Sequence, residues 1–124
     1  MSETDIKKNA VLGDPDLQEG LKSIHPIWAD FCIRVAGEAW GLPLIDQRTK
    51  AFITIAVDVV NGDQTGPGTA FGAHVSMAVK QGVTYEEIEE VLLFMSAYAG
   101  FNKTAPAFGA LKGLVEKGMF PGKK

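Results

Sequence analysis

The strongest constraint on the fold of this chain is a short break between two helical patterns at residues 82–84. Gly82 ends the first pattern, and Thr84 begins the second. The Thr84 hydroxyl can accept a hydrogen bond from the amide of Glu87, and the Glu87 carboxylate can accept one from the amide of Thr84. This reciprocal capping predicts a helix start at Thr84 and makes a small all-helical fold the first expectation.

Similar start and stop signals divide the rest of the chain. Asp14-Pro15, Pro26 and Asp46 each mark a helix start, and Gly100 marks an end. The pattern predicts an all-α fold of about six helices. They are expected over residues 14–23, 27–40, 46–60, 69–81, 84–98 and 102–117.

Two of these segments carry most of the apolar residues. Residues 51–60 are apolar nearly all round and should lie centrally in the core, although a buried strand is an alternative interpretation. The helix expected over residues 27–40 has an apolar face at helical spacing, which we also expect in the core. Its members are Ile27, Trp28, Phe31, Val35 and Ala39.

The length and composition indicate one folded domain. A chain of 124 residues fits a single domain, and 46% hydrophobic with 22% charged residues exclude a disordered chain. No linker is long enough to divide it. We therefore expect one domain over residues 1–124, in which residues 1–13 form a loose leader.

Several classes of partner are not expected. The net charge is −3, and no basic block occurs beyond Lys123-Lys124, so nucleic acid is an unsuitable partner. The apolar run 51–60 contains Asp58 and is too short to span a bilayer. The polar, acidic N-terminus does not resemble a secretory signal, so a cytoplasmic location is expected. Cys32 is the single cysteine, which excludes an intrachain disulfide or a Cys-x-x-Cys pair.

His74 is the best candidate for a proton carrier. A histidine side chain ordinarily has a pKa of about 6.5, which suits proton transfer near neutral pH. On its helix His74 shares a face with Ala70, Phe71 and Ala78, whose small or apolar side chains would leave room for a ligand. The alternative is a partly buried histidine bonded to a backbone carbonyl.

Asp58 is the candidate for a group that orients His74. It interrupts the apolar segment 51–60, where a carboxylate is costly unless it is paired. The alternative is that Asp58 faces solvent or serves the loop that begins at Asn61.

Two blocks of residues resemble the carboxymuconolactone decarboxylase family. The first is Gly37-Glu38-Ala39-Trp40 followed by residues 43–50. The second consists of His74, Gly82-Val83-Thr84 and Tyr98-Ala99-Gly100. Their order and spacing are similar to those of the family over roughly residues 35–112.

The resemblance implies an alkylhydroperoxidase D-like, all-α fold around a central antiparallel helical hairpin. It also implies a homotrimer or a hexamer of paired trimers, with a site that uses neither cofactor nor metal near the subunit interface. One branch of the family decarboxylates γ-carboxymuconolactone. The other branch uses a Cys-x-x-Cys pair just before the histidine.

The chain departs from both branches. The positions that match the thiol pair, Pro67 and Ala70, hold no cysteine. The decarboxylase branch typically has a glutamate four residues before the histidine, where this chain has Ala70. Asp58 is the residue that could replace the missing carboxylate.

The resemblance, together with the chemistry, assigns candidate roles. Decarboxylation without a cofactor needs an electron sink in the substrate, a cation that holds the substrate, and an acid that protonates the enolate. We expect His74 as the acid, assisted by Asp58 or Glu38. The candidate substrate-binding residues are Lys50, Arg48, Trp40, Tyr98 and Phe71. The alternatives are an Arg34–Glu38 ion pair, solvated charges at positions 48 and 50, and packing roles for Trp40 and Tyr98.

These residues are compatible with three functions. The leading one is a cofactor-free lyase that acts on a small anionic lactone or keto acid. The second is an alkylhydroperoxidase D-like antioxidant with peroxiredoxin activity, against which the absence of a second cysteine argues. The third is a non-catalytic ligand-binding relative, which Ala70 favours.

Overall fold

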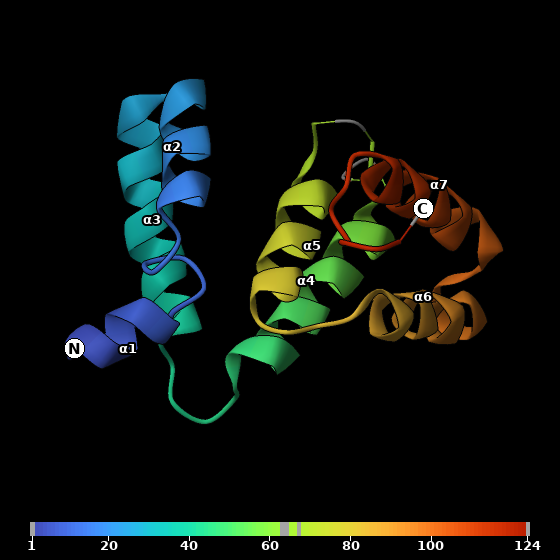
Figure 1. Ribbon diagram of the computed structural model, residues 1–124, viewed down its shortest axis with the longest axis horizontal. Helices are drawn as coiled ribbons and strands as arrows, with labels where there is room; N and C mark the ends of the chain where they lie inside the picture. Colours follow the sequence, from blue (N-terminus) through green and yellow to red (C-terminus); the bar gives the residue numbers. More distant parts are fainter. Residues whose placement is uncertain (1, 63–64, 67, 124) are drawn as a thin grey trace. The chain divides into compact units, whose positions relative to one another are not determined.

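The computed structural model describes residues 2–62, 65–66 and 68–123. Within these residues it contains seven α-helices and no strand (Figure 1). The helices are α1 (Glu3–Lys8), α2 (Pro15–Ile24), α3 (Pro26–Trp40), α4 (Gln47–Asn61), α5 (Ala70–Lys80), α6 (Tyr85–Ala99) and α7 (Phe101–Glu116). The all-α fold class is confirmed, and the strand alternative for residues 51–60 is wrong because α4 covers them.

The N-terminal residues differ from the loose leader expected. Ser2 begins α1 with a capping box in which its hydroxyl accepts from the amide of Asp5 at 3.1 Å. Asn9 is buried, and its side chain donates to the carbonyl of Gly37 at 2.9 Å and accepts from the amide of Val11 at 2.9 Å. One short helix was therefore missed, because its polar composition hides the capping signal.

The chain divides into two compact units, one up to Lys50 and one from Ala51 onward. In the first unit, α2 and α3 pack side by side (Figure 1). The Asp14 carboxylate caps α2 by accepting from the amide of Leu17 at 3.1 Å. The His25 ring nitrogen Nδ1 caps α3 by accepting from the amide of Trp28 at 3.2 Å. The expectation of a single domain stays a prediction.

The apolar face expected to be the buried side of α3 is exposed. Ile27 is 77% exposed and Phe31 is 59% exposed, and Trp28, Val35 and Ala39 are exposed as well. The buried side instead contains Ala29 and Gly37. A Cβ atom on Gly37 would lie 2.6 Å from the Leu12 side chain, so a larger residue here would require Leu12 to move. Periodicity could not identify the buried side because α3 carries apolar residues on more than one face.

The second unit contains most of α4 together with α5, α6 and α7. Its core is built from large apolar side chains that are almost fully buried. They are Ile55, Val59, Phe71, Val75, Ile88, Leu92 and Leu111. The predicted capping box at Thr84 is present, with the Glu87 amide 3.1 Å from the Thr84 hydroxyl and the Thr84 amide 3.0 Å from the Glu87 carboxylate.

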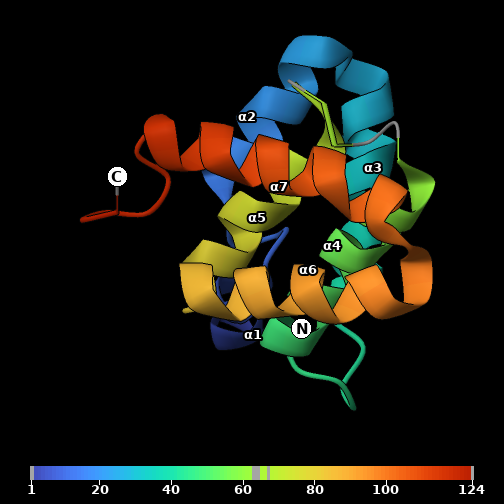
Figure 2. The same ribbon diagram turned by 90° about the vertical axis from the view of Figure 1, so that its right-hand side faces the viewer.

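Helices α6 and α7 lie against each other (Figure 2). Gly100 joins them with a φ of 97°, a backbone conformation that favours glycine. The hydroxyls of Ser96 and Thr104 hydrogen bond across the pair at 2.8 Å. Among the described residues, none of the helices is both long and apolar enough to span a membrane.

Candidate active site

The candidate site is a pair of side chains from α4 and α5. The Asp58 carboxylate oxygen Oδ2 lies 2.5 Å from the His74 ring nitrogen Nδ1. Asp58 lies on the buried side of α4 with Ala51 and Ile55, and 2% of its side chain is exposed. A carboxylate at that depth needs a partner, and His74 supplies it.

The bond to Asp58 fixes the tautomer and the orientation of the His74 imidazole. A carboxylate accepts hydrogen bonds, so it holds the proton of a neutral ring on Nδ1. The other ring nitrogen, Nε2, then carries a free lone pair, or a second proton when the ring is charged. The His74 side chain is 28% exposed, so the ring is neither sealed in the core nor fully in water. The pair is suited to accepting or donating a proton at Nε2.

The buried polar side chains that the structure describes are all hydrogen bonded. No buried side-chain nitrogen or oxygen of the described residues lacks a partner. No group of three or more His, Cys, Asp or Glu side chains that could hold a metal ion occurs among residues 2–62, 65–66 and 68–123.

The candidates that lie in the first unit have mainly structural contacts. The Lys50 ammonium donates to the carbonyls of Trp40 at 2.8 Å and Leu42 at 2.6 Å, and so fastens the end of α3. Trp40 is 7% exposed, which matches the packing alternative. Glu38 is exposed on α3, and Arg48 lies half-buried in the first turn of α4. Trp40 therefore fits the packing alternative, whereas Lys50 binds backbone carbonyls and is not the solvated charge considered as its alternative.

Arg34 and Asp46 also have local roles. The Arg34 guanidinium lies 5.2 Å from the centre of the Phe31 ring, a cation–π contact in place of the ion pair considered with Glu38. The Asp46 carboxylate accepts from the amide of Thr49 at 2.8 Å and caps α4, as predicted. Hydrogen bonds from Thr49 lower the pKa of Asp46.

The aromatic candidates in the second unit lie apart from one another. Phe71 is 1% exposed, and it lines a cavity between α5 and α7. Tyr98 is 82% exposed and contacts Phe94 in a tilted arrangement, with 5.2 Å between ring centres. It also lines a smaller hollow of about 310 Å³ with Lys103. His74 lines neither cavity. The structure therefore pairs His74 with Asp58 alone among the candidate residues.

Two features of the structure were not predicted from the sequence. Gln47 joins two segments of the first unit, accepting from the amide of Ala10 at 2.8 Å and donating to the carbonyl of Trp40 at 2.6 Å. No sequence pattern predicts that a glutamine will connect two segments in this way. The cavity between α5 and α7 did leave a signal, because Gly109 and Gly113 are spaced four apart on one face of α7.

A model of the carboxymuconolactone decarboxylase family matches residues 26–113. The chain belongs to this family. The matched range contains α3, α4, α5 and α6 and most of α7, and with them Asp58 and His74. The resemblance found in the sequence is confirmed.

A named relative agrees with the family assignment. The chain is 27% identical over 114 residues to a 4-carboxymuconolactone decarboxylase of Acinetobacter baylyi (strain ATCC 33305 / BD413 / ADP1). The similarity covers 89% of this chain and 79% of the relative. No solved structure matches the chain.

Proposed function

We propose that this protein is a cofactor-free decarboxylase that acts on a small anionic lactone or keto acid. The observation that carries the proposal is the Asp58–His74 pair, with 2.5 Å between carboxylate and Nδ1 and an almost fully buried carboxylate. Membership of the carboxymuconolactone decarboxylase family and the similarity to the Acinetobacter baylyi decarboxylase support it.

The chemistry begins in the substrate. The bond between the carboxylate carbon and the ring carbon breaks, and its electron pair passes into a conjugated carbonyl to form an enolate while carbon dioxide leaves. Protonated His74 then donates the proton of Nε2 to the enolate carbon. Asp58 keeps the ring in place and stabilises its charged form. Because His74 is 28% exposed, water can return the proton for the next turnover.

The remaining candidates are proposals that rest on the family motif. Glu38 is proposed as a second proton carrier, and Arg48 as the cation that contacts the substrate carboxylate, since a guanidinium suits bidentate binding. Lys50 is less suited, because its ammonium already donates to two backbone carbonyls. Tyr98 is proposed only as an apolar contact, whereas Phe71 lines the separate cavity between α5 and α7 and is not assigned to this reaction.

The deciding experiment measures carbon dioxide release from 4-carboxymuconolactone. We expect release by the wild type and a loss of about 100-fold to 10,000-fold in kcat for His74→Ala, the range typical of general acid–base groups. His25→Ala is the matched control, because His25 is the other histidine and caps α3. Full activity of His74→Ala would overturn the proposed mechanism, and absence of release by the wild type would favour another substrate or the non-catalytic alternative.

We also propose that the chain assembles into a homotrimer or a hexamer of paired trimers. The support is the number of large apolar side chains left exposed in both units, since monomeric proteins rarely expose extensive apolar patches. They include Ile27, Phe31 and Val35 of α3 and Phe94, Tyr98 and Phe101 of the second unit.

A further inference from the structure

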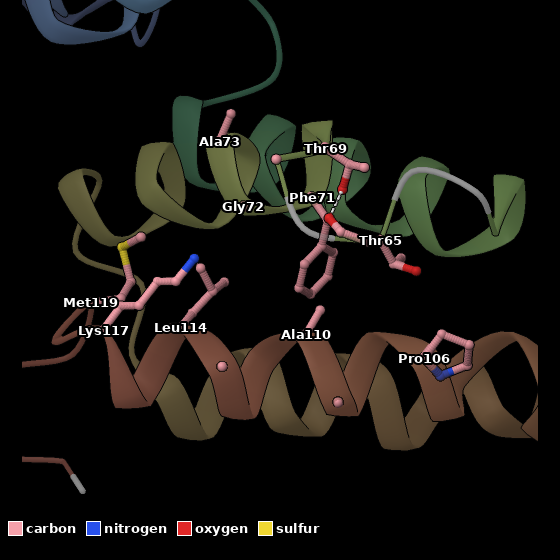
Figure 3. A pocket seen from close by; sticks show the side chains of 14 residues that line it. Thr65, Thr69, Phe71, Gly72, Ala73, Pro106, Ala110, Leu114, Lys117 and Met119 are labelled. Atoms are coloured by element: carbon pink, nitrogen blue, oxygen red, sulfur yellow. Dashed lines mark hydrogen bonds between the residues drawn. The ribbon is translucent and has the colours of Figure 1, made fainter.

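A cavity of about 660 Å³ lies between α5 and α7 in the second unit (Figure 3). Gly72 and Ala73 of α5 line it, whereas the next residue, His74, is bonded to Asp58 on α4. The cavity therefore lies on a different face of α5 from the proposed catalytic pair. A function for it is independent of the proposed decarboxylation.

The middle of the cavity is apolar. Phe71 projects from α5 toward Ala110 of α7, and Leu114 and Met119 continue the apolar wall toward the end of α7 (Figure 3). Pro106 lies toward the opposite end (Figure 3). Since an α-helix rises 1.5 Å per residue, the stretch of α7 from Pro106 to Lys117 gives the cavity a length of about 16 Å. Such a shape suits an elongated apolar body.

Two positions of α7 hold glycine although nothing within the chain requires it there. A Cβ atom on Gly109 or on Gly113 would meet nothing within 4 Å, so close packing does not require them. Neither has a positive φ, so backbone conformation does not require them. Glycine inside a helix is nevertheless less favourable than alanine. Their place on the cavity wall indicates space that is kept open for an occupant close to the α7 backbone.

Among the described residues that line the cavity, one has a charged side chain. The Thr65 hydroxyl donates to the carbonyl of Gly62 at 2.9 Å, and the Thr69 hydroxyl donates to the carbonyl of Gly66. At the other end Lys117 extends from α7 alongside Leu114, with its ammonium directed toward the space below α5 (Figure 3). The described residues provide the Lys117 ammonium with no hydrogen bond or ion pair. An occupant would therefore have its negative group at Lys117.

We propose that this cavity binds a free amphipathic carboxylate, such as a medium-chain fatty acid. The carboxylate pairs with Lys117, and the apolar chain lies along Gly113, Ala110 and Gly109 against Phe71. Charge complementarity at one end and an apolar trough along the rest select this chemistry over a neutral or cationic ligand. Oligomer contacts are a competing use of the same groove, and the experiment separates the two.

The test is titration of the full-length protein with decanoate, followed by calorimetry and by the NMR methyl signals of Leu114 and Met119. We expect saturable binding that moves both signals. Lys117→Gln should weaken decanoate binding about tenfold, the loss expected for one charge-assisted contact. Lys112→Gln is the matched control, because Lys112 is exposed on α7 and does not line the cavity.

A second variant fills the cavity. Gly113→Leu should weaken decanoate binding at least about tenfold, whereas Gly20→Leu, at an open helix position of α2, should not change it. Circular dichroism checks that both variants fold. The proposal is overturned if decanoate does not bind, or if Lys117→Gln behaves like Lys112→Gln. It is also overturned if Gly113→Leu dissociates an oligomer while decanoate binding is unchanged, since the occupant would then be a second copy of the chain.

Discussion

Asp58 lies in the core because the register of α4 places it on the same side as Ala51 and Ile55. A buried carboxylate without a partner destabilises a fold by several kcal/mol, so its contact with His74 also stabilises the second unit. One hydrogen bond thus links folding and the proposed chemistry. The same bond leaves Nε2 of His74 as the ring atom available to a substrate.

Substituting Asp58 with asparagine tests this link at the level of one residue. Asp58→Asn keeps the size of the side chain but removes the charge that stabilises a protonated ring and holds Nδ1–H. We expect kcat for carbon dioxide release to fall about 100-fold with little change in KM, because the substrate contacts remain. The ¹⁵N shifts of His74 should show loss of the Nδ1–H tautomer, while those of His25 stay unchanged. An unaltered His74 tautomer would show that Asp58 does not orient the ring.

Single residues differed in how far the sequence could predict them. A partner for Asp58 was predictable, because one carboxylate in an apolar run has few ways to be accommodated. The role of Lys50 was not, because it depends on carbonyls of Trp40 and Leu42 that only the turn between α3 and α4 brings within reach. A lysine at a helix start looks the same in the sequence whether it binds a substrate or a backbone.

At the scale of elements, the sequence predicted where helices begin more reliably than it predicted which face of a helix is buried. Prolines and capping residues placed α2, α3, α4 and α6, because these signals act through bonds to the next turn. Helices α5 and α7 begin without a side-chain cap, and Pro106 lies inside α7. The buried side of α3 depends on what packs against it, and there the small residues Ala29 and Gly37 lie inside while larger ones lie outside. Hydrophobic periodicity cannot detect such an arrangement.

The C-terminal segment contacts the start of α6 and provides a test of pH dependence. Phe120 meets the Tyr85 ring edge-on at 5.4 Å between centres, and the Lys123 ammonium lies 2.8 Å from the Glu86 carboxylate. The hydrogen bond from Lys123 lowers the pKa of Glu86 below its ordinary value of 4.5, and the same bond raises the pKa of Lys123 above 10.5. The lowered pKa of Glu86 means that its contribution is present above pH 4.5 and is lost as the pH falls through the folded pKa. The raised pKa of Lys123 means that its contribution is present below pH 10.5 and is lost as the pH rises through its folded pKa.

Lys123→Ala should therefore loosen the C-terminal segment most strongly within that pH window. The NMR shifts of the Phe120 ring report its contact with Tyr85, and we expect them to differ between the variant and the wild type at pH 7. As the pH falls through the folded pKa of Glu86, the difference should become smaller, because the ion pair is then lost in the wild type as well. The contact of the Lys123 ammonium with the Tyr85 ring, 4.3 Å from its centre, remains in acid. Lys112→Ala serves as the control for the removal of a lysine charge. A difference of the same size in acid as at pH 7 would mean that the ion pair does not hold the segment.

For the whole molecule, the family was predictable because its motif residues keep their order and spacing along the chain, from Glu38 to Tyr98. The division into two units was not predictable, since it falls inside α4, where the sequence has no linker. Nor does the sequence show which apolar side chains meet another chain. A large apolar residue gives the same sequence pattern whether its side chain is covered by the same chain or by a second copy.

The exposed apolar side of α3 offers the most direct test of assembly. Ile27 is 77% exposed and Phe31 is 59% exposed, and they are spaced four positions apart, so they lie on one face. If this face is a contact between copies, Ile27→Glu combined with Phe31→Glu should introduce buried, unpaired charges and dissociate the oligomer. We expect light scattering to show a trimer or hexamer for the wild type and a monomer for the double variant. Lys22→Glu on α2 is the control for added negative charge at an exposed position. An unchanged mass for the folded double variant would mean that other apolar residues, such as Phe94 and Phe101, hold the copies together.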